Sequence, residues 1–148
     1  MDENAGGVGP EGDGTSAGGR GLGRRLVSSG GRWEGIAGYS RAVVVGDACW
    51  VAGTTDAGPN GRALHPDDPA AQARTALERI RLALEEAGFA LGDVVRTRLF
   101  VTDMTRSDEV LRVHGEAFAA IRPAATIVAV SALIEPSLLV EIEADARR

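Results

Sequence analysis

Two carboxyl groups near the C-terminus have a spacing suited to acid–base chemistry. Glu141 and Glu143 lie two residues apart in an apolar, β-branched segment, so a strand would place both on one face. Mutual repulsion or burial raises a carboxyl pKa toward the range in which the group exchanges protons with a substrate. The alternative is structural, because Arg96 and Arg98 alternate in the same way and could pair with both glutamates across a sheet. The pattern alone favours this structural alternative.

Other side chains with catalytic potential are few. His65 lies in a predicted loop, and His114 lies beside an apolar helix stripe, where a partly buried, hydrogen-bonded histidine is more common than a catalytic one. Cys49 is the single cysteine, which excludes an internal disulfide, and we expect it to be buried and unreactive. No phosphate-binding glycine loop, nucleophile elbow or zinc-protease motif occurs. The single cysteine also excludes a cysteine-rich metal site.

The composition is that of a small globular protein. The chain has 148 residues, a formal net charge of −5 and 44% hydrophobic residues. Residues 1–23 are rich in glycine and poor in bulky apolar side chains, so we expect a disordered tail followed by one folded domain at 24–148. The acidic balance argues against a nucleic-acid partner, and no apolar run is long enough to span a membrane. A cytoplasmic protein is therefore expected.

Hydrophobic periodicity predicts strands separated by helices. The apolar and β-branched runs expected to form strands are 25–29, 41–45, 48–55, 94–102, 125–132 and 138–144. A helix is predicted to begin with Asp68 as its cap and to end at Gly88. A capping box at residues 105–108 is expected to begin a second helix, which Pro123 ends. Its apolar side is expected to contain Val110, Val113, His114, Ala117, Phe118 and Ile121.

The predicted element order has consequences for architecture. Two helices with apolar stripes must cover one face of a mixed β-sheet, which gives a two-layer α+β fold. The other face is expected to be partly apolar through Val51, Phe100 or their strand neighbours, and no remaining segment could cover it. An oligomer whose sheets meet across subunits is therefore expected.

Several short motifs occur in the order found in one known family. They are Gly38-Tyr39-Ser40-Arg41-Ala42-Val43, Gly53, Ala70-Ala-Gln72-Ala-Arg74, Glu86-Ala-Gly88, Asp93-Val-Val95, Phe100-Val-Thr-Asp103-Met104, Phe118, Pro123-Ala124 and Val140-Glu-Ile-Glu143. Together they resemble the RidA/YjgF family over about residues 38–144. The resemblance implies a chorismate-mutase-like α+β fold, a homotrimer with a small-molecule cleft at each subunit interface, and no metal or bound cofactor.

The resemblance also implies a chemistry. The best-known members hydrolyse reactive enamines and imines such as 2-aminoacrylate, with an arginine that holds the substrate carboxylate and a glutamate on the last strand that holds or activates water. Some relatives are described as translation-inhibiting ribonucleases. The acidic chain and the lack of a clear histidine pair rank that activity lower here.

The site residues implied by the resemblance are only partly present. Glu141 matches the family's glutamate and Tyr39 matches its cleft tyrosine. Three other positions differ, because Ala125 stands in place of the carboxylate-binding arginine, Ala52 in place of a cleft serine and Leu111 in place of a cleft asparagine.

Another arginine could replace the missing one. Arg98 and Arg122 are the preferred candidates, and Arg41 is a third. Two functional hypotheses remain open. One is an enzyme that acts on a small imine, enamine or carbonyl metabolite through Glu141. The other is a trimer that binds a small molecule or a partner without turnover.

Overall fold

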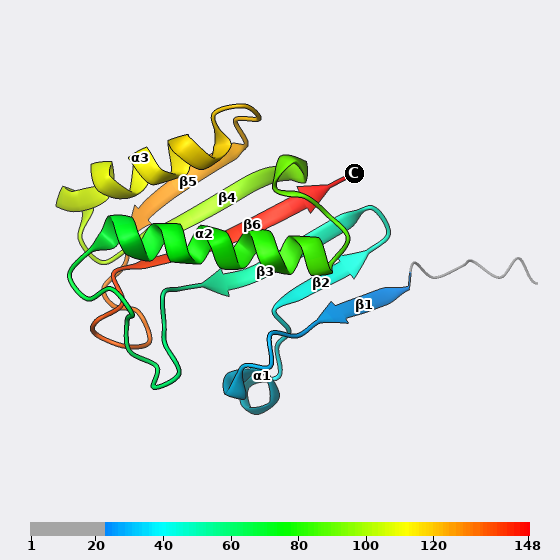
Figure 1. Cartoon of the computed structure of the whole chain (residues 1–148), viewed down its shortest axis with the longest axis horizontal. Coiled ribbons are helices and arrows are strands. Elements are labelled where there is room, and N and C mark those ends of the chain that lie inside the picture. Colours follow the sequence, from blue (N-terminus) through cyan, green and yellow to red (C-terminus); the bar gives the residue numbers. More distant parts are fainter. Residues whose placement is uncertain (1–22) are drawn as a thin grey trace, which may run out of the picture.

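A computed structural model describes residues 23–148, which form a six-stranded mixed sheet. In spatial order the strands are β1 (Arg24–Val27), β2 (Ala42–Val45), β3 (Ala48–Thr54), β6 (Val140–Arg147), β4 (Val94–Val101) and β5 (Ala124–Ala129) (Figure 1). Neighbouring strands are antiparallel except for β4 and β5, which are parallel. The expected tail at residues 1–23 lies outside the described residues except for Gly23.

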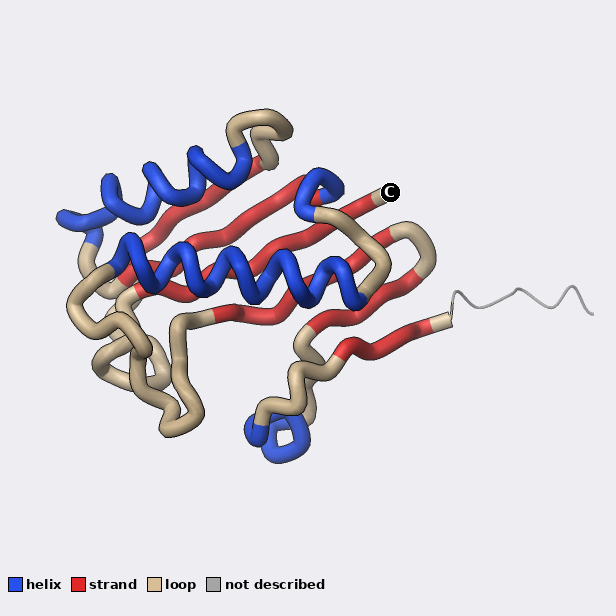
Figure 2. The backbone as a smooth tube through the Cα atoms, in the orientation of Figure 1, coloured by secondary structure: helices blue, strands red, loops and turns tan. Residues whose placement is uncertain are grey.

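Two long helices, α2 (Pro69–Glu86) and α3 (Ser107–Phe118), cover one face of the sheet (Figure 2). Shorter helical segments are α1 (Arg32–Ala37), η1 (Leu91–Asp93) and η2 (Met104–Arg106). The predicted two-layer α+β architecture is therefore confirmed. Within residues 23–148, no helix is both long enough and apolar enough to cross a lipid bilayer.

The core lies between α2, α3 and the inner face of the sheet. The α2 helix begins at a proline, and the Asp68 carboxylate accepts a hydrogen bond from the Ala71 amide at 2.9 Å. Side chains at steps of three and four along α2 are buried, among them Ala73, Ala76, Leu77, Ile80, Ala83 and Leu84. Strand β6 contributes Val140, Ile142 and Ala144 to the same core. The intervening glutamates therefore point to the face that the helices leave open.

Some predicted elements differ from the observed ones. The predicted capping box at residues 105–108 is wrong, because Asp103 instead accepts hydrogen bonds from the Thr105 amide and hydroxyl and caps η2. The second helix ends at Phe118 rather than at Pro123, so Ile121 lies beyond it and is exposed. Ala117 lies within the helix but is exposed rather than part of its buried side.

Helix α1 was not predicted, because it buries no side chain and gives no apolar stripe. Hydrogen bonds to the segment just before it hold it in place. The Glu34 carboxylate accepts hydrogen bonds from the Ser28 hydroxyl at 2.5 Å and the Ser29 hydroxyl at 2.6 Å. These bonds fix α1 to the end of β1, beside the start of β2.

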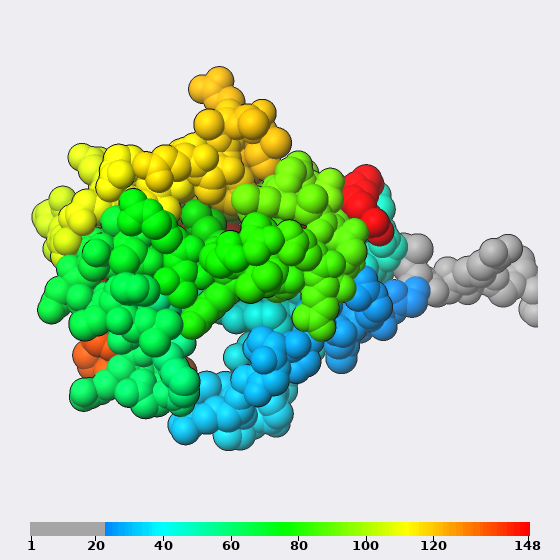
Figure 3. Space-filling model, viewed as in Figure 1, coloured from blue at the N-terminus to red at the C-terminus, as the bar shows by residue number. Residues whose placement is uncertain are grey.

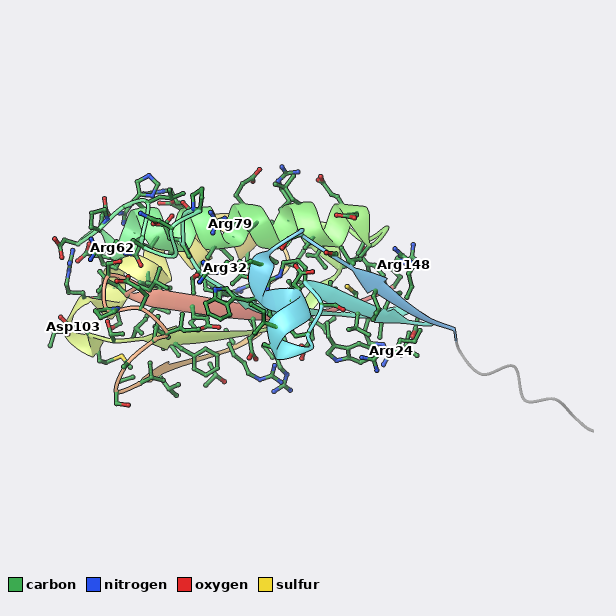
Figure 4. The ribbon with its side chains drawn as sticks, turned by 90° about the horizontal axis from the view of Figure 1, so that it is seen from below. Arg24, Arg32, Arg62, Arg79, Asp103 and Arg148 are labelled. Atoms are coloured by element: carbon green, nitrogen blue, oxygen red, sulfur yellow. The ribbon has the colours of Figure 1, made fainter. Side chains whose placement is uncertain are left out.

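The open face of the sheet carries apolar side chains. Trp50 on β3 is 46% exposed and Val128 on β5 is 40% exposed. Of the expected alternatives, a strand neighbour of Val51 provides the apolar surface, because Val51 itself is 3% exposed and points into the core, while Trp50 occupies the open face. Figure 4 shows the sheet from the side, with α2 along one face. The described residues thus leave a partly apolar sheet surface without a covering helix.

Candidate functional site

A β-bulge in β3 lies beside Glu141. Val51 pairs with Ala144 and Thr54 pairs with Ile142, so three steps along β3 match two steps along β6. The extra residue falls at Ala52 and Gly53. Bulges of this kind redirect the strand and are frequent beside active sites.

Gly53 provides the space that the Glu141 carboxyl group occupies. A Cβ atom built at Gly53 would lie 1.9 Å from Glu141 Oε1 and 2.9 Å from its Cδ, far inside contact distance. The backbone at Gly53 is not in the left-handed region, so glycine is required here for space rather than for conformation. The carboxyl group of Glu141 therefore lies directly against the backbone of β3.

The two glutamates of β6 have different electrostatic surroundings. Burial raises the pKa of Glu141, the negative charge of Glu143 raises it further, and Arg41 partly opposes both effects. Glu143 lies 3.4 Å from Arg98, which also contacts Asp145 at 3.4 Å. The alternative in which the glutamate pairs with an arginine across the sheet therefore holds for Glu143. Within residues 23–148, no arginine or histidine lies within ion-pair distance of Glu141.

Two half-buried arginines, Arg41 and Arg79, line the same cavity as this carboxyl group. Arg41 immediately precedes β2, and its Nη2 donates a hydrogen bond of 2.7 Å to the carbonyl oxygen of Gly53. Arg79 on α2 donates a hydrogen bond of 2.6 Å from Nη1 to the carbonyl oxygen of Thr55. Burial lowers the pKa of Arg41. The charges of Tyr39, Glu34 and Glu141 partly oppose this effect, and the positive charge of Arg79 adds a smaller lowering. The two guanidinium groups therefore hold the end of β3 in place and also repel one another.

Glu141 and both arginines line one cavity of about 670 Å³. Glu141 enters it from the sheet, whereas Arg79 enters it from the helix layer. The wall also includes Trp33, Tyr39, Pro59 and Ile134 among its larger side chains. Figure 3 shows the molecule hollowed between the segments around residues 30–45 and 55–80. In Figure 4, the labelled Arg79 and Arg32 lie near one another on this side of the sheet, and both line the cavity.

The structure brings together three of the predicted site residues, since Glu141, Tyr39 and Ala52 all line this cavity. The other four lie elsewhere in the described chain. Arg98 pairs with acidic residues of β6, and Leu111 is exposed on α3.

The remaining two, Arg122 and Ala125, are exposed at the start of β5. Within one chain, Arg41 lines this cavity and Arg98 and Arg122 do not, and the preference for Arg98 or Arg122 stays a prediction. Arg41 is the candidate that lies beside Glu141.

The sequence did not predict that Arg79 lines the cavity or that Gly53 makes room for Glu141. Arg79 had no distinguishing signal, because α2 also carries surface arginines such as Arg81, which pairs with Glu78 and Glu85. Gly53 did give a signal, since a glycine inside a strand often marks a bulge or a close approach.

The histidines and the cysteine lie outside the cavity lining. The His114 Nε2 lies 2.8 Å from the Thr97 hydroxyl, and burial lowers the pKa of this imidazole, as expected for a hydrogen-bonded, partly buried histidine. His65 lies 3.1 Å from the buried carboxylate of Asp56. Cys49 is fully buried, as predicted, and burial raises its pKa. No cluster of three or more potential metal ligands occurs within residues 23–148.

The fold and cavity define an α+β protein in which a half-buried carboxyl group with a raised pKa lines a ligand-sized cavity. A family model described as endoribonuclease L-PSP matches residues 31–148. The chain therefore belongs to the YjgF/RidA family.

Relatives and solved structures agree with this assignment. The uncharacterized protein SCO2049 of Streptomyces coelicolor is 37% identical over 125 residues, which cover 84% of this chain and 92% of that protein. A RutC family protein of Pyrococcus horikoshii, PH0854, is 34% identical over 72% of this chain and 83% of its own length.

The crystal structure of Rv2704 from Mycobacterium tuberculosis, a member of the YjgF/YER057c/UK114 family, is 54% identical with a TM-score of 0.78 and covers 85% of this chain and 100% of that one. The Rid family protein YyfA from Yersinia pestis is 28% identical with a TM-score of 0.75, and the match covers 85% of this chain and 100% of that one.

Proposed function

We propose that the protein hydrolyses a small reactive imine or enamine, or processes a related carbonyl metabolite, in the cavity beside Glu141. The observation that carries the proposal is the position of this carboxyl group in the cavity together with its raised pKa. It lines the cavity, burial raises its pKa, and no arginine or histidine of residues 23–148 forms an ion pair with it. A raised carboxyl pKa is the property that acid–base catalysis needs. Family membership supports the same chemistry.

Glu141 would act first as a base and then as an acid. Its ionised carboxylate accepts a proton from water while the water oxygen forms a bond to the carbon of a protonated C=N group. The C=N electron pair moves to nitrogen. The carboxyl group then returns the proton to nitrogen. The C–N bond breaks and the C=O bond forms as the departing ammonia takes up the hydroxyl proton, so that the products are the carbonyl compound and ammonium and Glu141 is again ionised. The sequence of steps consumes one water and requires no cofactor or metal.

The test is the lifetime of an imine generated in situ from phenylglycine by an amino-acid oxidase. Semicarbazide traps the surviving imine, so its yield reports how fast the protein removes it. Wild-type protein should shorten the lifetime, and Glu141→Gln should reduce the rate by about 10²–10⁴-fold, the usual effect of losing a general base. Glu143→Gln is a matched control, because Glu143 lies on the same face of β6 but does not line the cavity.

The alternative proposal is ligand binding without turnover. It is favoured by the three positions at which Ala52, Leu111 and Ala125 differ from the family's deaminase pattern. Two results together would support it: an imine lifetime that wild-type protein leaves unchanged, and measurable binding of the corresponding carbonyl acid. Equal binding by wild-type and Glu141→Gln protein would then assign the cavity a role in recognition alone.

We also propose a homotrimer, located in the cytoplasm, in which the open sheet faces of three chains meet. The exposed Trp50 and Val128 support this assembly, since isolated chains rarely leave apolar sheet surface uncovered. Arg122 and Ala125, at the exposed edge strand, would then be available to a neighbouring copy's cavity. Light scattering should give three times 15.3 kDa for the full-length chain, and Trp50→Glu should shift it toward monomer. A wild-type monomer at micromolar concentration contradicts this proposal.

A further inference from the structure

Within residues 23–148, the two arginines that line the cavity with Glu141 form no ion pair, although the charges of Glu34 and Glu141 act on Arg41 from a greater distance. Surface arginines such as Arg81, Arg106 and Arg112 each lie within 3.2 Å of a carboxylate oxygen. In contrast, within residues 23–148 neither Arg41 nor Arg79 has a carboxylate within ion-pair distance, although both are half-buried. Their only side-chain hydrogen bonds in this part of the chain go to backbone carbonyl oxygens of Gly53 and Thr55.

The pair also lies where two cavities meet. The cavity that contains Glu141 measures about 670 Å³, and a second cavity on the side of α2 measures about 340 Å³. Arg41, Ala57 and Arg79 line both cavities. The guanidinium groups are therefore accessible from the cavity where Glu141 lies, in an environment where a charge-assisted hydrogen bond is stronger than in water.

We propose that Arg41 and Arg79 form an anion-binding subsite that holds the carboxylate of the molecule on which Glu141 acts. The inference rests on the proposed function and adds the class of ligand to it. Two adjacent guanidinium groups repel one another until an anion lies between them. A carboxylate is the anion that can be carried directly beside the reacting C=N or C=O carbon. The two ends of the ligand would then be fixed, the anion by the arginines and the reacting carbon by Glu141.

The rest of the wall indicates the other part of the ligand. Trp33 is 43% exposed and Ile134 is 80% exposed, and both line the cavity beside Pro59. A volume of about 670 Å³ lies within the range of pockets that hold drug-sized ligands, and it exceeds what a three-carbon acid fills. We therefore infer an anionic metabolite with an apolar or aromatic group next to its reacting carbon.

Benzoylformate and its methyl ester are suitable probes, because they share the aromatic ring and the ketone but differ in charge. Calorimetric titration of the full-length protein should show that the acid binds at least about 10-fold more tightly than the ester, the usual effect of a charge-assisted contact. Arg79→Gln, and separately Arg41→Gln, should reduce this preference to less than about threefold. The ratio of the two affinities is the readout, because a general disturbance of the cavity weakens both probes alike.

Arg74→Gln is the matched control. Arg74 lies on α2 like Arg79, and its replacement changes the net charge equally, but it is exposed and does not line either cavity. This variant should keep the wild-type preference. The inference is overturned if wild-type protein binds acid and ester equally, binds neither at millimolar concentration, or keeps its preference in Arg79→Gln.

The imine assay separates this inference from the proposed function. A preference for the acid that depends on Arg79, in a protein without Glu141-dependent turnover, would leave the subsite in place and contradict hydrolysis. Glu141-dependent turnover in a protein that binds acid and ester equally would support hydrolysis and contradict the anion-binding subsite. Glu141→Gln should keep or increase the preference for the acid, because it removes a negative charge that acts on Arg41.

Discussion

Gly53→Ala changes the position of the carboxyl group on which the account depends. The added Cβ would lie 1.9 Å from Glu141 Oε1, whereas ordinary contacts begin near 3.4 Å, so that oxygen must move by about 1.5 Å. A displacement of about 1 Å at a reacting group can cost on the order of 10²-fold in rate. We therefore expect at least that loss in imine hydrolysis.

The same substitution should leave the fold intact. The backbone at Gly53 is not in the left-handed region, so alanine can adopt it, and the clash is with a side chain that can rotate. Overpacking of a well-packed site costs about 1–3 kcal/mol, which we take as the upper range for the loss in unfolding free energy. Gly92→Ala is the control, because a Cβ there meets nothing within 4 Å.

Three measurements decide this prediction. A crystal structure of Gly53→Ala should show the Glu141 carboxyl group displaced, and NMR titration should show its pKa closer to the ordinary glutamate value as burial is lost. The imine assay should show the loss in rate. An unmoved Glu141 side chain, or full activity in a variant where it has moved, would refute the argument that Gly53 positions the reacting group.

Further changes test the electrostatics and packing that surround the site. Because burial raises the pKa of Glu141 above its ordinary value of 4.5, its ionisation opposes folding; Glu141→Gln should therefore match wild-type stability at acidic pH and exceed it at neutral pH in urea unfolding. Equal stability at neutral pH would contradict this. The buried Gln72 amide donates to the carbonyl oxygens of His65 and Ser137 and accepts from the Leu139 amide, so Gln72→Ala should lower the unfolding free energy by about 2–4 kcal/mol. A loss below about 1 kcal/mol would show that these bonds are replaced by water. Cys49 is fully buried with a raised pKa, so Ellman's reagent should modify it only on unfolding, and rapid labelling of folded protein would be inconsistent with the structure.

Periodicity in the sequence predicts most of the sheet and both long helices. Apolar side chains at alternating positions of β6, or at steps of three and four along α2, must be buried together, so the elements and their inner faces follow from the pattern. The same alternation correctly places Glu141 and Glu143 on the open face. Helix boundaries that depend on hydrogen bonds within a loop are harder to predict from the sequence, as the cap at Asp103 shows.

The candidate site is harder to predict because its parts come from separated segments. Glu141 and Tyr39 were identified by resemblance, but Arg79 joins them only through the way α2 lies across the end of β3. Arg98 and Arg122 have side chains equally suited to bind an anion, so their residue type could not distinguish them from Arg41. The difference lies in tertiary neighbours: Arg98 has acidic partners on β6, and Arg41 does not.

The pH dependence of imine hydrolysis tests the central claim most directly. The wild-type rate should rise with pH through a midpoint above 4.5 that coincides with the Glu141 pKa measured by NMR in the same protein. Glu143→Gln should keep a rising profile, and Glu141→Gln should lose the catalysed rate at every pH. A catalysed rate in Glu141→Gln with the wild-type profile would contradict the assignment of Glu141 as the group that exchanges protons with the substrate.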